Sequence, residues 1–331
     1  MRSECVTVVG AGRMGLAVAQ LMATEGCSVK LVSRHKLTLN RAIEEIQSNL
    51  ILLQKLEHLN DSVEEILGRI DLVKGVSEPI FDCDFLFEAI PENPQLKKSF
   101  LADIDPYLED KTIIASTTST INLKTFNGIL TKPDRLLITH WLNPAFIIPL
   151  VEIALGEETS IEAAERMKSF LKEIGKIPVL LKDSPGFIIP RIQSVVMNEA
   201  VRILEDGVAS VEDIDTAIKA GFGFRLCVFG LLEFVDLGGL DILYYADQFL
   251  YSVLPQDQFK VPALIQEKME RNEIGPRTGK GIYDYSGIDT RSLFENRYQG
   301  FVELLDFIKS SKTLAFEGGI KIKDKESSSD A

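Results

Sequence analysis

The feature that most constrains the fold is a glycine-rich segment near the N-terminus, Gly10-Ala11-Gly12-Arg13-Met14-Gly15, which matches the pattern G-x-G-x-x-G. It follows a short β-branched run at 5–9 and opens a helical pattern that ends at Gly26, before a second strand pattern at 28–32. Alone the pattern is weak, but between a strand and a helix it is typical of a dinucleotide site rather than an empty turn. The glycines permit a tight turn, close approach of a pyrophosphate, and packing of the helix on the strand. We therefore expect a β-α-β unit that binds phosphates at the helix N-terminus.

Strand and helix patterns continue to alternate after this unit. The pattern 37–58 predicts a long helix, and a shorter helix follows with Asn60-Asp61-Ser62 at its start and Glu65 at the capping-box position. Four apolar runs predict further strands: 85–89, 112–115, 136–139 and 148–153. This alternation favours an α/β fold with an open, mostly parallel sheet.

The pattern changes after Asp183-Ser184-Pro185-Gly186, because helical periodicity predominates from 187 to 270. The segment 226–251 is strongly apolar yet carries spaced acids, which fits either a domain core or a buried dimer interface. The predicted division is a dinucleotide-binding domain at 1–182, an all-helical domain at 183–310 and a disordered, low-complexity tail at 311–331.

Composition limits the class of protein and of partner. A chain of 331 residues suggests two domains at ~150 residues each. An apolar content of 45% and a charged content of 26% exclude disordered, collagen-like and coiled-coil classes. The net charge of −13 gives a surface that repels phosphate backbones, so we expect no nucleic-acid partner. An anionic small ligand needs only a local cluster of donors.

Cysteine spacing and hydropathy bear on disulfides, metal sites and cellular location. Cys5, Cys27, Cys83 and Cys227 lie far apart without a CxxC pair, so we expect neither a disulfide framework nor a metal site. The apolar stretch at 5–9 is too short for a signal-peptide core, and no uncharged apolar run reaches the ~18 residues of a membrane span. We expect a soluble cytoplasmic protein with no membrane partner.

The end of the second predicted strand bears on the choice of cofactor. A site specific for NAD usually carries Asp or Glu there, whereas this chain has Ser33-Arg34-His35-Lys36. A missing carboxylate beside a guanidinium suits the 2′-phosphate of NADP, which arginine binds through its planar fork. The alternative is that these residues are solvated at a helix start, so NADP is favoured and NAD stays open.

One histidine stands where ligands bind in open α/β sheets. His140 closes the predicted strand 136–139, and the carboxyl ends of such strands line the binding crevice. Twelve residues later, Glu152 lies in the apolar run 149–153, where a buried carboxylate needs a partner such as an imidazole. The hydroxyl cluster 116–120 ends another strand. A lone buried histidine is more often structural, but this combination favours a catalytic one.

With these motifs in place, the sequence resembles the 3-hydroxyacyl-CoA dehydrogenase family over about 4 to 286. The motifs that carry the resemblance are GAGRMG (10–15), AIPEN (89–93), ASTTST (115–120), HWLNP (140–144), PLVE (149–152), DSPGF (183–187) and TGKGIYDY (278–285). The resemblance implies a Rossmann-type, doubly wound, mostly parallel sheet followed by an all-helical C-terminal domain that forms a homodimer. It also implies an NAD(P)-dependent oxidoreductase of fatty acid metabolism. Relatives that act on free 3-hydroxy acids include L-gulonate dehydrogenase, with its lens λ-crystallin counterpart, and carnitine dehydrogenase.

The resemblance assigns roles to individual residues. His140 matches the catalytic histidine and Glu152 its paired carboxylate, while Ser119 matches the serine that contacts the substrate oxygen. Asn143 matches the asparagine beside the nicotinamide and the histidine. The residues expected to contact the cofactor are Gly10, Gly12, Arg13, Met14, Gly15, Ser33, Arg34, Glu92 and Lys97.

Two departures from the family pattern affect substrate and cofactor. The second-domain motif G-F-I/V-x-N-R reads Gly186-Phe187-Ile188-Ile189-Pro190-Arg191 here, so proline replaces the asparagine that reaches the active site. Ser33 replaces the family's aspartate.

Three functions therefore compete. The default is dehydrogenation of a short 3-hydroxyacyl-CoA such as 3-hydroxybutyryl-CoA, although Arg41, Lys55 and Arg69 are few cations for coenzyme A. A free 3-hydroxy acid needs one cation, for which Arg191 or Arg225 is a candidate. Arg225 has an equal alternative, an ion pair with Glu233 or Asp236. The third function is a nucleotide-binding dimer without turnover.

Overall fold

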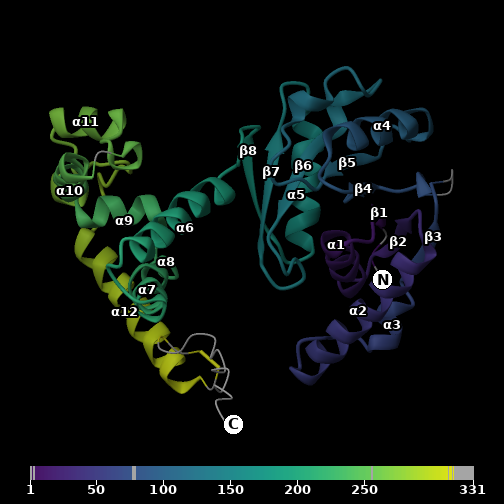
Figure 1. Ribbon diagram of the computed structural model, residues 1–331, viewed down its shortest axis with the longest axis horizontal. Coiled ribbons are helices and arrows are strands. Elements are labelled where there is room, and N and C mark those ends of the chain that lie inside the picture. The colour runs from purple at the N-terminus through teal and green to yellow at the C-terminus, as the bar shows by residue number, and fades with distance from the viewer. Residues whose placement is uncertain are drawn as a thin grey trace, which may run out of the picture. The chain divides into compact units, whose positions relative to one another are not determined.

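A computed structural model describes residues 2, 4–76, 80–254, 256–311, 313–314 and 316. The chain divides into two compact units, Met1–Gln193 and Ser194–Ala331 (Figure 1). Most of the tail expected to be disordered, from 317 onward, lies outside the described residues.

The first unit is built on one eight-stranded sheet. Its strand order is β3-β2-β1-β4-β5-β6-β7-β8. The strands are β1 (Cys5–Val9), β2 (Ser28–Ser33), β3 (Ile70–Lys74), β4 (Phe85–Glu88), β5 (Ile113–Ser116), β6 (Leu136–Trp141), β7 (Leu150–Leu155) and β8 (Ile177–Lys182). Every neighbouring pair is parallel except β6 and β7, which run antiparallel. The predicted α/β class and mostly parallel sheet are thus confirmed.

Helices cover both faces of this sheet, which is why its central strands are apolar without alternation. In β4, Phe85 and Phe87 pack on one face while Leu86 packs on the other. The helices of the unit are α1 (Arg13–Thr24), α2 (Lys36–Lys55), α3 (Val63–Leu67), α4 (Pro94–Ile104) and α5 (Ile161–Glu173). The core of the first face contains residues of α1, α2, α3 and α5, and that of the second face contains residues of α4.

Local signals explain where the helices begin. Ser62 accepts from the Glu65 amide while the Glu65 carboxylate accepts from the Ser62 amide, so the predicted capping box is present at α3. Asn93 caps α4 by accepting from the Leu96 amide at 2.9 Å. The predictions missed β3 and β8, which are the two edges of the sheet.

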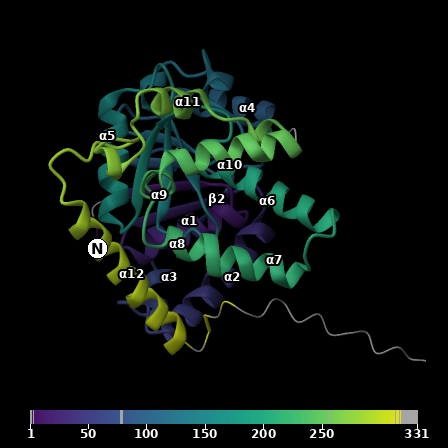
Figure 2. The same ribbon diagram turned by 90° about the vertical axis from the view of Figure 1, so that its left-hand side faces the viewer.

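In its described part, the second unit consists of helices and their connections, with isolated β-bridges that join Lys280 to Gly275 and Asp284. Its helices are α7 (Val211–Ala217), α8 (Phe224–Leu226), α9 (Leu231–Gly238), α10 (Leu240–Val253), α11 (Ala263–Glu270) and α12 (Thr290–Ser310), while α6 (Ile189–Glu205) enters it from the first unit. Figure 2 faces these helices, with α10 and α11 close together. In the described part of the chain, no helix combines the length and apolar character needed to cross a bilayer.

The TGKGIYDY motif has a structural role in this unit. The fully buried Asp236 of α9 accepts hydrogen bonds from the amides of Ile282 and Tyr283, both at 2.8 Å, and from the Tyr285 hydroxyl at 3.1 Å. A Cβ at Gly281 would lie 2.4 Å from the Asp236 carboxylate, so only glycine fits there without a shift.

Candidate active site

The glycine loop lines a cavity of about 560 Å³ at the carboxyl ends of the central strands. The residues that surround the cavity are Val9–Met14, Val32–His35, Thr38, Val76, Ala89–Pro91, Leu96, Ser99, Phe100 and Asp103. The loop following β1 and the loop following β4 therefore meet here, as expected for a crevice in an open α/β sheet.

The three glycines of the loop have distinct environments. Gly10 has φ +111°, and a Cβ there would lie 2.3 Å from the Ala89 carbonyl oxygen. A Cβ at Gly15 would lie 1.7 Å from the Gly10 carbonyl oxygen. At Gly12 a Cβ would meet no described atom within 4 Å, so this position leaves open space on the cavity wall. Helix α1 starts at Arg13 with no side-chain cap, which leaves its first amides for an anion. These features fit a dinucleotide phosphate.

The residues expected to select the cofactor line the same cavity. Ser33 is half-buried, and Arg34 and His35 are exposed. Within the described part of the chain, Arg34 makes no ion pair, so its guanidinium is available to a ligand. The acidic side chain in this cavity is Asp103 of α4, and no carboxylate stands at the end of β2.

His140 and Glu152 form a buried hydrogen-bonded pair. They face one another in the antiparallel register of β6 and β7, and His140 Nδ1 lies 2.7 Å from Glu152 Oε2. The other carboxylate oxygen, Oε1, accepts from the amides of Ile188 at 2.8 Å and Ile189 at 3.0 Å, where α6 begins. With Nδ1 held by the carboxylate, Nε2 is the ring nitrogen left for a ligand.

The environment of Glu152 keeps it ionised. Burial raises its pKa, but the hydrogen bonds from His140 and from the Ile189 and Ile188 amides lower it more, so the pKa lies below its ordinary value. A carboxylate in this state orients the imidazole and stabilises its protonated form, which suits His140 to accept and return a proton.

A second cavity, of about 260 Å³, places His140 next to the glycine loop. Its walls are Met14, Ala89, Ile90, Glu92, Thr117–Thr120, His140 and Trp141. Because it shares Met14, Ala89 and Ile90 with the larger cavity, one extended ligand can lie in both. The structure thus brings together four of the sequence motifs that were singled out.

The hydroxyl cluster following β5 leaves one hydroxyl unused. The Thr118 and Thr120 hydroxyls donate to Glu92, the Thr117 hydroxyl donates to the Glu88 carbonyl, and the Ser116 hydroxyl donates to the Glu88 carboxylate. Among the described residues, the Ser119 side chain has no hydrogen-bond partner, although it lines the cavity with His140. Ser119 is therefore the hydroxyl of the cluster that is available to a substrate.

Other site candidates lie elsewhere. Lys97 is fully buried and lines neither cavity, because its Nζ binds the Glu88 carboxylate at 2.6 and 2.8 Å. Asn143 is exposed in the loop after β6, and Arg191 is exposed in α6. Sequence reasoning did not identify Glu88, although a carboxylate in the apolar run 85–89 is the same signal that identified Glu152.

Arg225 corrects two expectations. The alternative ion pair is wrong: Glu233 binds Arg297 at 2.6 Å, and the Asp236 carboxylate is occupied by its loop. The Arg225 guanidinium instead lies over the Phe234 ring, 5.3 Å from its centroid. The segment 221–225, which its glycines suggest is loop-like, is instead helical, because a π-helical turn at Ile218–Gly223 continues into α8.

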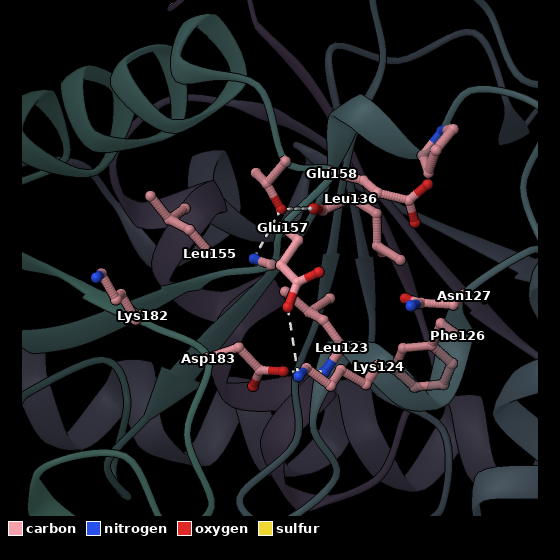
Figure 3. Close-up of a pocket in the computed structure, with 13 residues that line it drawn as sticks. Leu123, Lys124, Phe126, Asn127, Leu136, Leu155, Glu157, Glu158, Lys182 and Asp183 are labelled. Atoms are coloured by element: carbon pink, nitrogen blue, oxygen red, sulfur yellow. Dashed lines mark hydrogen bonds and ion pairs between the residues drawn. The ribbon is translucent and has the colours of Figure 1, made fainter.

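A third cavity, of about 410 Å³, lies at the strand ends opposite those that line the glycine-loop cavity, where β6 begins and β7 and β8 end (Figure 3). Lys124 and Glu157 form an ion pair at its wall, with 3.3 Å between Nζ and Oε1. None of the sequence motifs contributes to its lining apart from Asp183, whose carboxylate accepts from the Leu123 amide at 2.7 Å.

Two family models match the chain in succession. Residues 5–184 match the "3-hydroxyacyl-CoA dehydrogenase, NAD binding domain", and residues 186–285 match the "3-hydroxyacyl-CoA dehydrogenase, C-terminal domain". The first of these matches bears out a nicotinamide cofactor for this chain.

Individual proteins are similar over most of their length. The mitochondrial hydroxyacyl-coenzyme A dehydrogenase of Sus scrofa is 33% identical over 287 residues, which cover 85% of this chain and 90% of that protein. The 5-formyl-3-hydroxy-2-methylpyridine 4-carboxylate 5-dehydrogenase of Mesorhizobium japonicum is 29% identical over 300 residues, 90% and 96% of the two chains. A crystal structure of a 3-hydroxyacyl-CoA dehydrogenase from Archaeoglobus fulgidus matches with a TM-score of 0.75 at 31% identity, covering 93% of this chain and 100% of that one.

Proposed function

This chain belongs to the 3-hydroxyacyl-CoA dehydrogenase family, and on that premise we propose that it transfers a hydride between C3 of a 3-hydroxyacyl-CoA and a nicotinamide cofactor. The default substrate is 3-hydroxybutyryl-CoA. The observation that carries the proposal is the His140–Glu152 pair, 2.7 Å apart, on a cavity that continues into the glycine-loop cavity.

His140 and Ser119 of the second cavity, together with Glu152, have roles in this reaction. His140 Nε2 takes the proton of the 3-hydroxyl group in oxidation and returns it in reduction. Glu152 fixes the imidazole and stabilises the imidazolium, while the unused Ser119 hydroxyl donates to the substrate oxygen. The bound nicotinamide supplies the hydride acceptor or donor. The glycine loop and the first amides of α1 hold its phosphates.

For the cofactor, NADP is the proposed preference. Its support is the absence of a carboxylate at the end of β2 together with an unpaired Arg34 on the cavity wall. In Arg34→Ala, affinity for NADP should fall at least about tenfold while affinity for NAD stays the same, because only NADP carries the 2′-phosphate. An equal effect on both cofactors would refute the preference.

A free 3-hydroxy acid is the second candidate substrate, and three observations favour it. Arg69, one of the three cations considered above for coenzyme A, is already bound to Asp61 at 2.5 Å and to the Ala23 carbonyl at 2.9 Å. The relative from Mesorhizobium japonicum is named for a pyridine carboxylate, without a CoA thioester. Pro190 cannot make the side-chain contact of the asparagine it replaces.

A homodimer through the second unit completes the proposal, with 1–182 as the cofactor domain and 183–310 as the domain for substrate and dimerisation. On α10, Ile242, Tyr245 and Phe249 are 64%, 62% and 66% exposed, and their spacing of three and four residues puts them on one helix face. An exposed apolar stripe of this kind is typical of a subunit interface.

The test is nicotinamide absorbance during turnover of acetoacetyl-CoA, in parallel with NADH and NADPH. Rapid oxidation of either cofactor supports the acyl-CoA reaction, and the faster cofactor decides the preference. If the chain binds cofactor but does not turn over acetoacetyl-CoA, the assay is repeated with free 3-hydroxy acids. If neither substrate class is turned over, the remaining function is that of a nucleotide-binding dimer without catalysis.

A further inference from the structure

Lys176, the residue before β8, is a buried cation that the proposed reaction does not use. It is 7% exposed, and it lines neither the glycine-loop cavity nor the cavity with His140. Among the described residues its ammonium forms no ion pair, and burial lowers its pKa while the charge of Glu25 opposes this effect. Because lysine is rarely buried without a carboxylate partner, its other contacts are informative.

The contacts of Lys176 lie in the β6–β7 connection (142–149), which joins strand β6 to strand β7. Its Nζ donates to the Ala145 carbonyl at 2.7 Å and to the Ile148 carbonyl at 2.9 Å. Ala145 is fully buried, so without the ammonium its carbonyl oxygen would be left unpaired in the core.

The other hydrogen bonds of the β6–β7 connection are made by its own backbone and at its end. Inside it, the amides of Ile147 and Ile148 donate to the Pro144 carbonyl, both at 3.0 Å. At its end, the Ile177 amide donates to the Pro149 carbonyl at 2.8 Å. Among the described residues, the middle of the connection is therefore hydrogen-bonded to the rest of the unit through the ammonium that precedes β8.

The His140–Glu152 pair lies close to this connection. In the antiparallel ladder, Trp141 opposite Val151 is the last pair before the connection, and His140 opposite Glu152 is the pair before that one. The geometry of the segment that joins two antiparallel strands fixes their register, and pairs beside a loosened segment open first. Release of the connection would therefore disturb His140 and Glu152 before the rest of the sheet.

We propose that Lys176 is a positioning residue that acts through the β6–β7 connection: by holding two of its carbonyls, the ammonium keeps His140 aligned with Glu152. The inference rests on the proposed function for its activity readout. Its structural readout depends only on the hydrogen bond between His140 and Glu152.

The structural test follows the proton between His140 Nδ1 and Glu152 Oε2 by NMR. His35 and His58 are exposed whereas His140 is 6% exposed, so the ring N–H of His140 is the one shielded from water. Its resonance is assigned by its absence from His140→Ala. In Lys176→Met, which keeps an apolar side chain without a donor, this proton should exchange with water at least about tenfold faster than in wild type.

Two further substitutions separate the donor from the rest of the side chain. Lys176→Arg keeps a cationic donor, so the exchange rate should stay close to that of wild type. If Lys176→Met does not fold, Lys176→Gln takes its place, because its shorter side chain cannot reach both carbonyls and the same acceleration is expected. Exchange at the wild-type rate in the variant that lacks the ammonium would overturn the proposal.

The matched control is Arg135→Met. Arg135 is also 7% exposed and also donates to a backbone carbonyl, that of Glu109, but it lies directly before β6, at the end of the strand remote from His140. The control should lose stability while the His140 proton exchanges as in wild type. Equal acceleration in Arg135→Met and Lys176→Met would indicate general loosening and contradict positioning by Lys176.

Turnover of acetoacetyl-CoA supplies the second readout. Lys176→Met should lower kcat by about 10- to 100-fold with little change in the KM for cofactor, because small misplacements of a reacting group are costly. Arg135→Met should keep the kcat of wild type. Faster proton exchange with an unchanged kcat in Lys176→Met would contradict the role in positioning. Faster exchange in a protein whose wild type turns over neither substrate class would instead refute the proposed function.

Discussion

At the scale of single residues, the site depends on carboxylates that are buried and fully hydrogen-bonded. Glu152 accepts from one imidazole nitrogen and two backbone amides, and Glu88 accepts from a lysine, a serine and an amide. Because the oxygens of such a carboxylate are already bonded to specific donors, the carboxylate fixes the orientation of the groups around it. His140, the group proposed to exchange a proton with the substrate, is thus oriented by Glu152, which lines neither cavity.

The lowered pKa of Glu152 predicts a pH-dependent stability. A carboxyl group whose pKa is lower in the folded state stabilises that state above its ordinary value of 4.5, and this stabilisation is lost as the pH falls through the lowered folded value. Glu152→Gln should therefore reduce the free energy of unfolding at pH 7 by about 1–3 kcal/mol.

Thermal unfolding of wild type and Glu152→Gln between pH 3 and pH 7 measures this difference. The gap in Tm should be widest near neutrality and narrow toward pH 3. In Glu165→Gln, which loses only an exposed contact to Lys168, no such gap should appear. A gap that is constant with pH would show that the charge of Glu152 does not stabilise the fold.

Which residues form the site was partly readable from the sequence. His140 and Glu152 could be picked because each follows or interrupts an apolar strand pattern, and the structure places them opposite one another in adjacent strands. Ser119 was distinguished from the other hydroxyls of 116–120 only by the family resemblance. Glu88 carries the same signal as Glu152 but was not identified, and the ion pair expected for Arg225 was wrong because Glu233 is bound by Arg297, which lies far along the chain. The Glu233–Arg297 pair spans 64 positions.

At the scale of elements, the glycine loop and helix α1 form the proposed binding unit for the cofactor phosphates. Gly15 and Gly12 differ in what an added methyl group would meet: the Gly10 carbonyl oxygen at 1.7 Å in the first case and open cavity in the second. A substitution at Gly15 should therefore affect mainly stability, whereas a substitution at Gly12 should affect mainly ligand binding.

Gly15→Ala should lower the free energy of unfolding by about 1–3 kcal/mol or more, because a backbone carbonyl must move to admit the methyl group. Gly12→Ala should leave stability nearly unchanged and weaken cofactor binding at least about tenfold, since its methyl group occupies space at the phosphates. Denaturant titration and cofactor fluorescence measure the two effects. Equal cofactor affinity in Gly12→Ala and wild type would contradict the placement of the phosphates.

Element prediction succeeded inside the sheet and failed at its edges. The central strands are buried on both faces and appear as continuous apolar runs, as in β4 and β6. The missed strands have weaker patterns because an edge strand is partly solvated: β3 carries exposed Asp71 and Leu72, and β8 carries Pro178. Proline is tolerated at an edge, where one side of the strand has no partner.

At the scale of the whole molecule, the chain is acidic, with a net charge of −13, while its reaction requires anionic ligands. Local donors resolve this conflict under the proposed function: the uncapped N-terminus of α1 and Arg34, which has no ion-pair partner among the described residues, supply positive potential at the proposed phosphate site. The second unit provides instead the apolar surface of α10, which bears on assembly.

The proposed dimer predicts a sedimenting mass of twice the 36.8 kDa of one chain. Phe249→Glu on α10 should give monomers, because it places a charge in the apolar interface. Leu56→Glu at the end of α2, where leucine is 65% exposed, is the control and should stay dimeric. A monomeric wild type at micromolar concentration would contradict the assignment of this helix face.

The measurement that tests the central claim most directly compares wild type with His140→Ala in acetoacetyl-CoA reduction, with cofactor binding measured on the same samples. The account predicts that the variant binds NADH or NADPH as wild type does, while its kcat falls by about 10²–10⁴ because the proton donor is lost. Equal turnover by the two proteins would show that His140 is not the acid–base group of this site.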